Sequence, residues 1–153
     1  MRGTQTRLNG SGSSVEQTSA APADVLQVLD PTVLIDFLRG RPAVSRLAGL
    51  RSTGDVPATT AINVEEVVRG LRPAEVGAAE TLFRGLLVLP VDAEVAWTAG
   101  AWRRDFAAHG VTLFQADCLV ATTAFVHRAT LVTGNPRDFP MRELMVEHWP
   151  VGA

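Results

Sequence analysis

The sequence contains no lysine and no tyrosine, and its only cysteine is Cys118. All fourteen basic residues are therefore arginine, a bias that we attribute mainly to a GC-rich genome. The absence of lysine excludes every mechanism that needs a catalytic lysine. A single cysteine cannot form an internal disulfide, and this fits a protein of a reducing cytosol.

Long apolar segments are also missing from the chain. No run approaches the length of a membrane span, and the first residues lack the apolar core of a signal peptide. The formal net charge at pH 7 is -2, so no overall basic field favours nucleic acid. We therefore expect a cytoplasmic protein with no membrane partner.

The 153 residues suffice for one domain with a full hydrophobic core. Residues 1–24 are rich in Gly, Ser, Thr and Ala and show no apolar periodicity. This composition predicts a disordered N-terminal tail, which is either a cloning tail or the product of an upstream start codon. The folded domain is expected over residues 25–153.

From residue 25 onward, short apolar segments alternate with helical patterns. Strands are expected over residues 25–30, 56–62, 86–91, 129–134 and, near the end of the chain, 146–149. Helices are expected between them, with Thr32, Pro42, Asn63 and Asp92 at their starts. This alternation predicts an α/β fold in which helices cover both faces of a parallel sheet.

Acidic and polar residues gather where these strands end. In parallel sheets, sites lie beyond the carboxyl ends of the strands. The residues expected at that edge are Asp30, Glu66, Asp117, Thr133, Asn135 and Asp138. Carboxylates that converge repel one another, so some stay protonated or a cation offsets them. Oxygen ligands suit Mg²⁺ or Mn²⁺, and such a site performs phosphoryl chemistry.

Each acid also has a purely structural explanation. Asp30 would cap the following helix, and Glu66 would form a capping box with Asn63. Asp117 would be favoured by the dipole at a helix start, and Asp138 would stabilise a turn. The metal-site hypothesis depends on all four acids lying together.

Four motifs occur in a recognisable order: VLDPTVLID at 28–36, EVVRG at 66–70, ADCLVATTA at 116–124 and LVTGNPRDF at 131–139. In this order and at these spacings they resemble PIN-domain ribonucleases, specifically the VapC toxins of bacterial type II toxin–antitoxin pairs. The resemblance covers residues 25 to about 149. Glu66 is preferred to Glu65 because it stands four residues before Gly70, as in the family pattern.

This resemblance implies a three-layer PIN-like domain with a central parallel sheet flanked by helices. It implies an endoribonuclease that depends on Mg²⁺ or Mn²⁺ and cleaves structured cellular RNA, such as tRNA, rRNA or mRNA. Asp30, Glu66, Asp117 and Asp138 would hold the metal, while Thr133 and Asn135 would orient water or an acidic side chain. It also implies a VapB-like antitoxin as partner and a homodimer.

One position departs from the family pattern. Pro31 stands where the family usually has Thr or Ser, which removes a backbone N–H and a hydroxyl beside the site. Thr32 is the residue that would take over part of this polar role. The alternative function is therefore a catalytically weakened PIN domain that acts as a protein- or RNA-binding module.

Several residues outside the acidic set also have an expected role. Asp36 is expected on a solvated helix face, and Cys118 as an inert buried thiol. Trp97, Trp102 and Phe106 share roughly one helix face, which predicts a core or interface role. The residues Arg69 and Arg137 adjoin the motifs and are candidates for contact with RNA phosphates.

Overall fold

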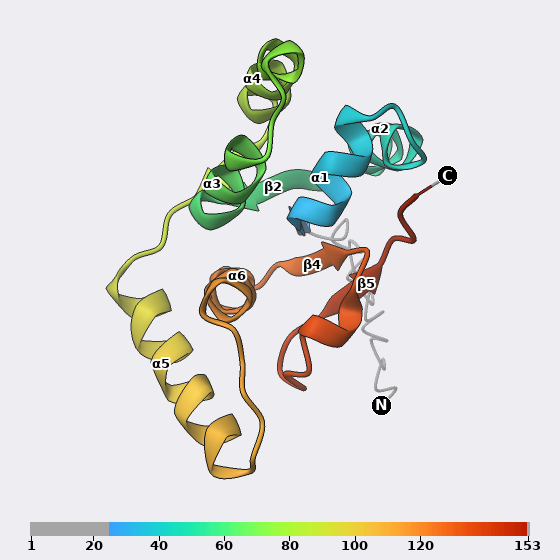
Figure 1. Ribbon diagram of the computed structural model, residues 1–153. Coiled ribbons are helices and arrows are strands. Elements are labelled where there is room, and N and C mark those ends of the chain that lie inside the picture. Colours follow the sequence, from blue (N-terminus) through green and yellow to red (C-terminus); the bar gives the residue numbers. More distant parts are fainter. Residues whose placement is uncertain (1–24, 153) are drawn as a thin grey trace, which may run out of the picture.

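The computed structural model describes residues 25–152, so the predicted N-terminal tail at 1–24 lies outside the described residues. A sheet of five parallel strands forms the centre of the domain, in the order β3-β2-β1-β4-β5 (Figure 1). The strands are β1 Leu26–Leu29, β2 Val56–Thr60, β3 Leu87–Leu89, β4 Thr130–Thr133 and β5 Val146–His148. The predicted parallel α/β fold is confirmed.

Helices connect the strands and cover the sheet on both faces (Figure 1). The α-helices are α1 Pro31–Leu38, α2 Ala43–Thr53, α3 Ala61–Arg69, α4 Val76–Arg84, α5 Ala93–Ala108 and α6 Gln115–Val126. Two short 3-10 helices are η1 Pro73–Glu75 and η2 Pro136–Asp138. No helix among residues 25–152 is long and apolar enough to cross a membrane.

Neighbouring residues of one strand belong to two different cores, because successive side chains of a strand point to opposite faces. Val28 of β1 and Leu131 of β4 pack with residues of α5 and α6. Leu29 and Val132, the next residues in these strands, pack with residues of α1, α2 and α3. All four are almost fully buried, and each such burial contributes about 1.5–3 kcal/mol. The three-layer arrangement therefore follows from strands whose successive apolar side chains are buried on both faces of the sheet.

Two of the predicted helix starts are wrong and two are confirmed. Asp30, not Thr32, caps α1, and its side chain accepts the backbone N–H of Thr32. Thr60, not Asn63, caps α3, because β2 runs directly into this helix and the Thr60 hydroxyl accepts the backbone N–H of Asn63 at 3.1 Å. Pro42 and Asp92 stand at the starts of α2 and α5 as predicted. A capping box between Asn63 and Glu66 does not form, because Asn63 lies inside the first turn.

Asp36 is not on a solvated face, since only 2% of it is exposed. Its Oδ2 accepts the backbone N–H of Ala43 at 3.1 Å, and its Oδ1 accepts that of Gly152 at 2.9 Å. The side chain thus joins α1 to the first turn of α2 and to the end of the described chain. The sequence pattern of a helix does not reveal such a distant acceptor role.

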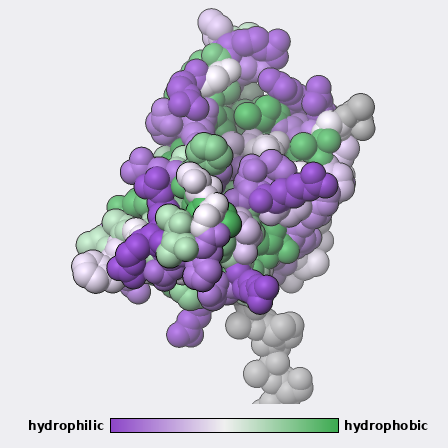
Figure 2. Space-filling model, turned by 60° about the horizontal axis from the view of Figure 1, so that its bottom comes forward, coloured by the Kyte–Doolittle hydropathy of each residue, from purple (hydrophilic) through white to green (hydrophobic). Residues whose placement is uncertain are grey.

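The three aromatic residues of α5 do not share one environment. Trp102 and Phe106 pack against the core, and Trp102 contacts the ring of Phe125 at 5.2 Å between centroids. Trp97 is 83% exposed, which contradicts a core role for it in the isolated chain. Figure 2 shows apolar residues separated by polar ones on the face that it draws. Cys118 is fully buried, and burial raises the pKa of its thiol, as an inert role requires.

Candidate functional site

The centre of the site is the carboxyl end of β1 and β4, two strands that lie side by side. Leu29 pairs with Val132 in the register of these strands, which places the next residues, Asp30 and Thr133, next to each other. The backbone N–H of Asp30 donates to the carbonyl of Val132 at 2.9 Å. The Thr133 hydroxyl donates to Oδ2 of Asp30. Strand pairing therefore fixes the first acid of the site.

Asp30 is only 7% exposed and is held from two sides. Besides the Thr133 hydroxyl, it accepts the backbone N–H of Thr32 at 3.4 Å and the Thr32 hydroxyl at 3.3 Å. The Thr32 hydroxyl in turn accepts the backbone N–H of Gly134 at 2.9 Å. Burial raises the pKa of Asp30 in spite of these hydrogen bonds, and the charge of Glu66 adds to the rise. Asp30 is thus a helix cap whose charged form is disfavoured by burial.

The charges of the other three acids reach Asp117, which lies in the first turn of α6. Burial is the largest cause that raises the pKa of Asp117 to about 6, and the charges of Asp138, Asp30 and Glu66 raise it further, in that order. The structure therefore brings the four predicted acids within electrostatic reach of one another. They come from the end of β1, from helices α3 and α6, and from η2, which follows β4.

Glu66 lies on α3 and is partly buried. Burial raises its pKa, while the charge of Arg69 lowers it and that of Glu65 raises it. Arg69 is exposed at the end of α3, and Arg137 is exposed in η2. The charge of Arg69 therefore acts on one of the predicted site acids, Glu66.

Thr133 and Asn135 each hold one acid of the site. Thr133 donates to Asp30, as described, and its oxygen accepts the backbone N–H of Asn135 at 3.0 Å. The side-chain amide of Asn135 donates to Oδ2 of Asp138 at 2.7 Å. The segment after β4 therefore links the first acid to the last through two polar side chains.

A buried polar pair beneath the site was not predicted from the sequence. Thr59 and Asn63 are both 0% exposed, and each donates a hydrogen bond of 2.9 Å to the carbonyl of Leu29. Asn63 also donates to the Thr59 hydroxyl at 3.1 Å. These bonds tie α3, and with it Glu66, to the end of β1. The sequence feature that could have indicated this pair is the two threonines, Thr59 and Thr60, at the end of β2.

The side chains of the site offer the oxygen atoms that Mg²⁺ and Mn²⁺ prefer. Within residues 25–152, no three His, Cys, Asp or Glu side chains already stand together as a metal-binding group. Mg²⁺ usually binds through one or two carboxylates and completes its shell with water and substrate phosphate, so it needs no such group. The repulsion that raises the pKa of Asp117 is what a cation would relieve. The donor set therefore fits a hard divalent cation.

A family model described as the PIN domain matches residues 28–142. The chain belongs to the PIN-domain family. Among curated relatives it is similar to ribonuclease VapC19 of Mycobacterium tuberculosis, with 32% identity over 117 residues, 76% of this chain and 94% of the relative. The match extends over nearly the whole VapC protein, which confirms the predicted resemblance to the VapC type.

Solved structures of related complexes show the same PIN fold. DNA-bound VapBC from Salmonella typhimurium has a TM-score of 0.72 and 24% identity, covering 82% of this chain and 98% of the matched one. FitAcB from Neisseria gonorrhoeae has a TM-score of 0.65 and 26% identity, covering 81% and 97%. The PIN-like three-layer architecture predicted from the motifs is therefore confirmed.

Proposed function

We propose that this PIN domain is the toxin of a type II toxin–antitoxin system and acts as a metal-dependent endoribonuclease in the cytoplasm. The observation that supports this most is that three of the site acids act electrostatically on the fourth. The charges of Asp138, Asp30 and Glu66 all raise the pKa of Asp117. A purely structural set of helix caps has no reason to converge in this way. The similarity to a curated VapC ribonuclease supports the same activity.

Asp30, Glu66, Asp117 and Asp138 hold Mg²⁺ or Mn²⁺ in this proposal. The cation, when bound, would offset their charges and supply Lewis-acid activation of the phosphodiester and of water. Thr133 fixes the Asp30 carboxylate by its hydroxyl, and Asn135 fixes Asp138 by its amide. These polar contacts keep the acids in place before RNA arrives, which reduces the reorganisation needed for cleavage.

The substrate proposed for this site is structured cellular RNA, and the proposed protein partner is a VapB-like antitoxin. Related VapC chains have been solved in VapBC complexes. An apolar hollow of about 440 Å³ between α3 and α4, lined among others by Val68, Leu71, Val76 and Phe83, suits a segment of such a partner. A homodimer of the toxin belongs to the same proposal.

The structure of the Pro31 region supports the enzyme over a non-catalytic binding module. Pro31 is the first residue of α1, where a backbone N–H has no partner within the helix. Thr32 supplies a hydroxyl that contacts the Asp30 carboxylate. In this proposal Thr32 takes over part of the polar role of the hydroxyl that Pro31 lacks.

An RNA cleavage assay with purified protein and total cellular RNA tests this function. We expect cleavage in Mn²⁺ that stops in EDTA and in the Asp30→Asn variant. The matched control is Asp105→Asn on α5, an exposed acid whose contact in the structure is with the neighbouring Arg104. Sequencing of the new RNA ends would then identify the target. Equal cleavage by Asp30→Asn and wild type, or undiminished cleavage in EDTA, would contradict the proposal.

A further inference from the structure

Three arginines surround a hollow at the C-terminal ends of α1 and α3. The hollow has a volume of about 470 Å³ and is lined by Arg39, Arg41, Gly70, Arg72 and Glu75, and we call it the arginine hollow. Arg39 and Arg41 follow α1, while Gly70 and Arg72 follow α3. All three arginines are exposed. Two loops that are distant in the sequence thus place positive charge around one opening.

Positive charge is in excess in the arginine hollow. Glu75 is its one acid, and it is paired with Arg72 by a contact of 2.5 Å. The hydrogen bond from Arg72 is the main reason why the pKa of Glu75 is lowered to about 2. The positive charge of Arg39 lowers this pKa further. Among residues 25–152, neither Arg39 nor Arg41 forms a salt bridge. Two guanidinium groups therefore stay available for an anion.

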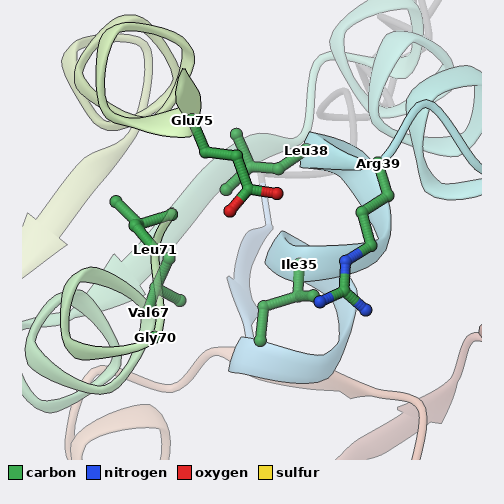
Figure 3. A pocket seen from close by; sticks show the side chains of 7 residues that line it. All are labelled: Ile35, Leu38, Arg39, Val67, Gly70, Leu71 and Glu75. Atoms are coloured by element: carbon green, nitrogen blue, oxygen red, sulfur yellow. The ribbon is translucent and has the colours of Figure 1, made fainter. Parts of the chain in front are cut away.

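A narrow crevice beside this hollow shares the lining residues Arg39, Gly70 and Glu75 with it. Figure 3 shows Arg39 and Glu75 around this crevice, together with Ile35 of α1 and Leu71, which follows α3. The crevice has a volume of only about 30 Å³, the space of roughly one water molecule in the liquid, so no peptide side chain of useful size enters it. The anion would therefore bind at the open, charged rim and not in the apolar floor.

Asp30 and the arginine hollow lie at opposite ends of α1. Asp30 caps the start of this helix and Arg39 its end. At 1.5 Å per residue the two lie about 13 Å apart along the helix axis. An RNA strand cleaved at Asp30 that runs along α1 would place a phosphate farther along the strand, beyond the one next to the cleaved bond, over the arginines.

We propose that the arginine hollow binds a backbone phosphate of the RNA substrate that lies along the same strand but away from the cleaved bond. This inference rests on the proposed ribonuclease function and names a second contact of the same strand. Guanidinium groups present paired N–H donors that match phosphate oxygens. Such a contact positions the strand and is independent of base identity, as phosphate contacts are.

The binding test uses the full chain in EDTA, so that RNA is bound but not cleaved. The probe is a fluorescent single-stranded RNA oligomer, titrated with wild type and with the double variant Arg39→Gln/Arg41→Gln. We expect an affinity loss of about tenfold. The slope of log affinity against log salt concentration should fall by about 0.7 for one lost phosphate contact. Thermal melts check that both proteins fold equally.

The matched control is Arg84→Gln/Arg104→Gln, which removes the same charge from two exposed arginines on α4 and α5. If both double variants lose RNA affinity equally, the effect is one of net charge and the proposal is overturned. It is also overturned if the Arg39/Arg41 variant keeps its RNA affinity but loses affinity for an oligoglutamate peptide, which would indicate an acidic protein partner.

A kinetic arm separates this inference from the ribonuclease proposal. In Mn²⁺, the Arg39/Arg41 variant should raise KM and leave kcat unchanged, because the arginines lie away from the cleaved bond. A fall in kcat at unchanged KM would overturn the positioning role. Failure of wild type to cleave any RNA would refute the proposed function, while the titration in EDTA would still decide whether the hollow binds RNA.

Discussion

Replacing Asp117 by Asn should stabilise the metal-free protein at neutral pH. The pKa of Asp117 is raised from 3.8 to about 6, by burial first and then by three neighbouring acids. A raised pKa means that the folded state holds the proton more tightly than the unfolded chain does. The contribution of protonated Asp117 to the free energy of unfolding is therefore complete below about pH 4 and is lost as the pH rises through about 6.

The size of this effect follows from the pKa. A rise from 3.8 to about 6 corresponds to about 3 kcal/mol as an upper limit. Asp117 is only partly buried, and solvent screening reduces the expected effect to roughly 1 kcal/mol. In a domain of this size, that free energy changes the melting temperature by about 3–5 °C.

Urea unfolding in EDTA, measured between pH 4 and pH 7.5 on wild type and Asp117→Asn, checks this prediction. The free energy of unfolding of wild type should fall relative to the variant as the pH rises. A structural role of Asp117 at the start of α6 predicts the opposite sign, because an ionised acid stabilises a helix N-terminus by about 0.3–1 kcal/mol. A variant that is less stable than wild type at pH 7.5, by an amount that grows with pH, would refute the convergence of the acids.

Three further predictions concern the supports of the site and the tail. Thr133→Val should lower the free energy of unfolding by about 1 kcal/mol and reduce RNA cleavage, because the first acid loses its hydroxyl partner; an unchanged cleavage rate would contradict this. Asp36→Ala should cost about 3 kcal/mol in urea unfolding, since the N–H groups of Ala43 and Gly152 lose their acceptor, and a loss below 1 kcal/mol would show that water replaces it. Deletion of residues 1–24 should leave the melting temperature and cleavage unchanged, whereas a clear loss of stability would place the domain boundary earlier.

The parallel sheet was predictable because its signals are local. Segments such as 26–29 and 130–133 are short, apolar and followed by polar residues, and both are strands. Their alternation with helical patterns leaves few arrangements other than a covered parallel sheet. The same arrangement predicts that polar residues at the strand ends meet. Asp30 and Thr133 do meet there, in direct contact.

The helix starts and the distant contacts were less predictable. Thr60 and Asn63 are both good capping residues, and only the direct passage from β2 to α3 decides between them. The acceptor role of Asp36 depends on the backbone of Gly152, more than a hundred residues away, to which no periodicity points. The exposure of Trp97 was not predictable either, because a helical pattern does not tell which aromatic residues pack into the core.

Binding of Mn²⁺ to the purified full-length protein, followed by electron paramagnetic resonance of the free ion, tests the proposed metal site most directly. We expect saturable binding to wild type and to the Asp105→Asn control, and a loss of affinity of at least about tenfold in Asp30→Asn. Bound Mn²⁺ at a hundredfold excess over its Kd should also stabilise the fold by about 2.7 kcal/mol. The absence of saturable binding, or the same affinity in wild type and Asp30→Asn, would contradict the account.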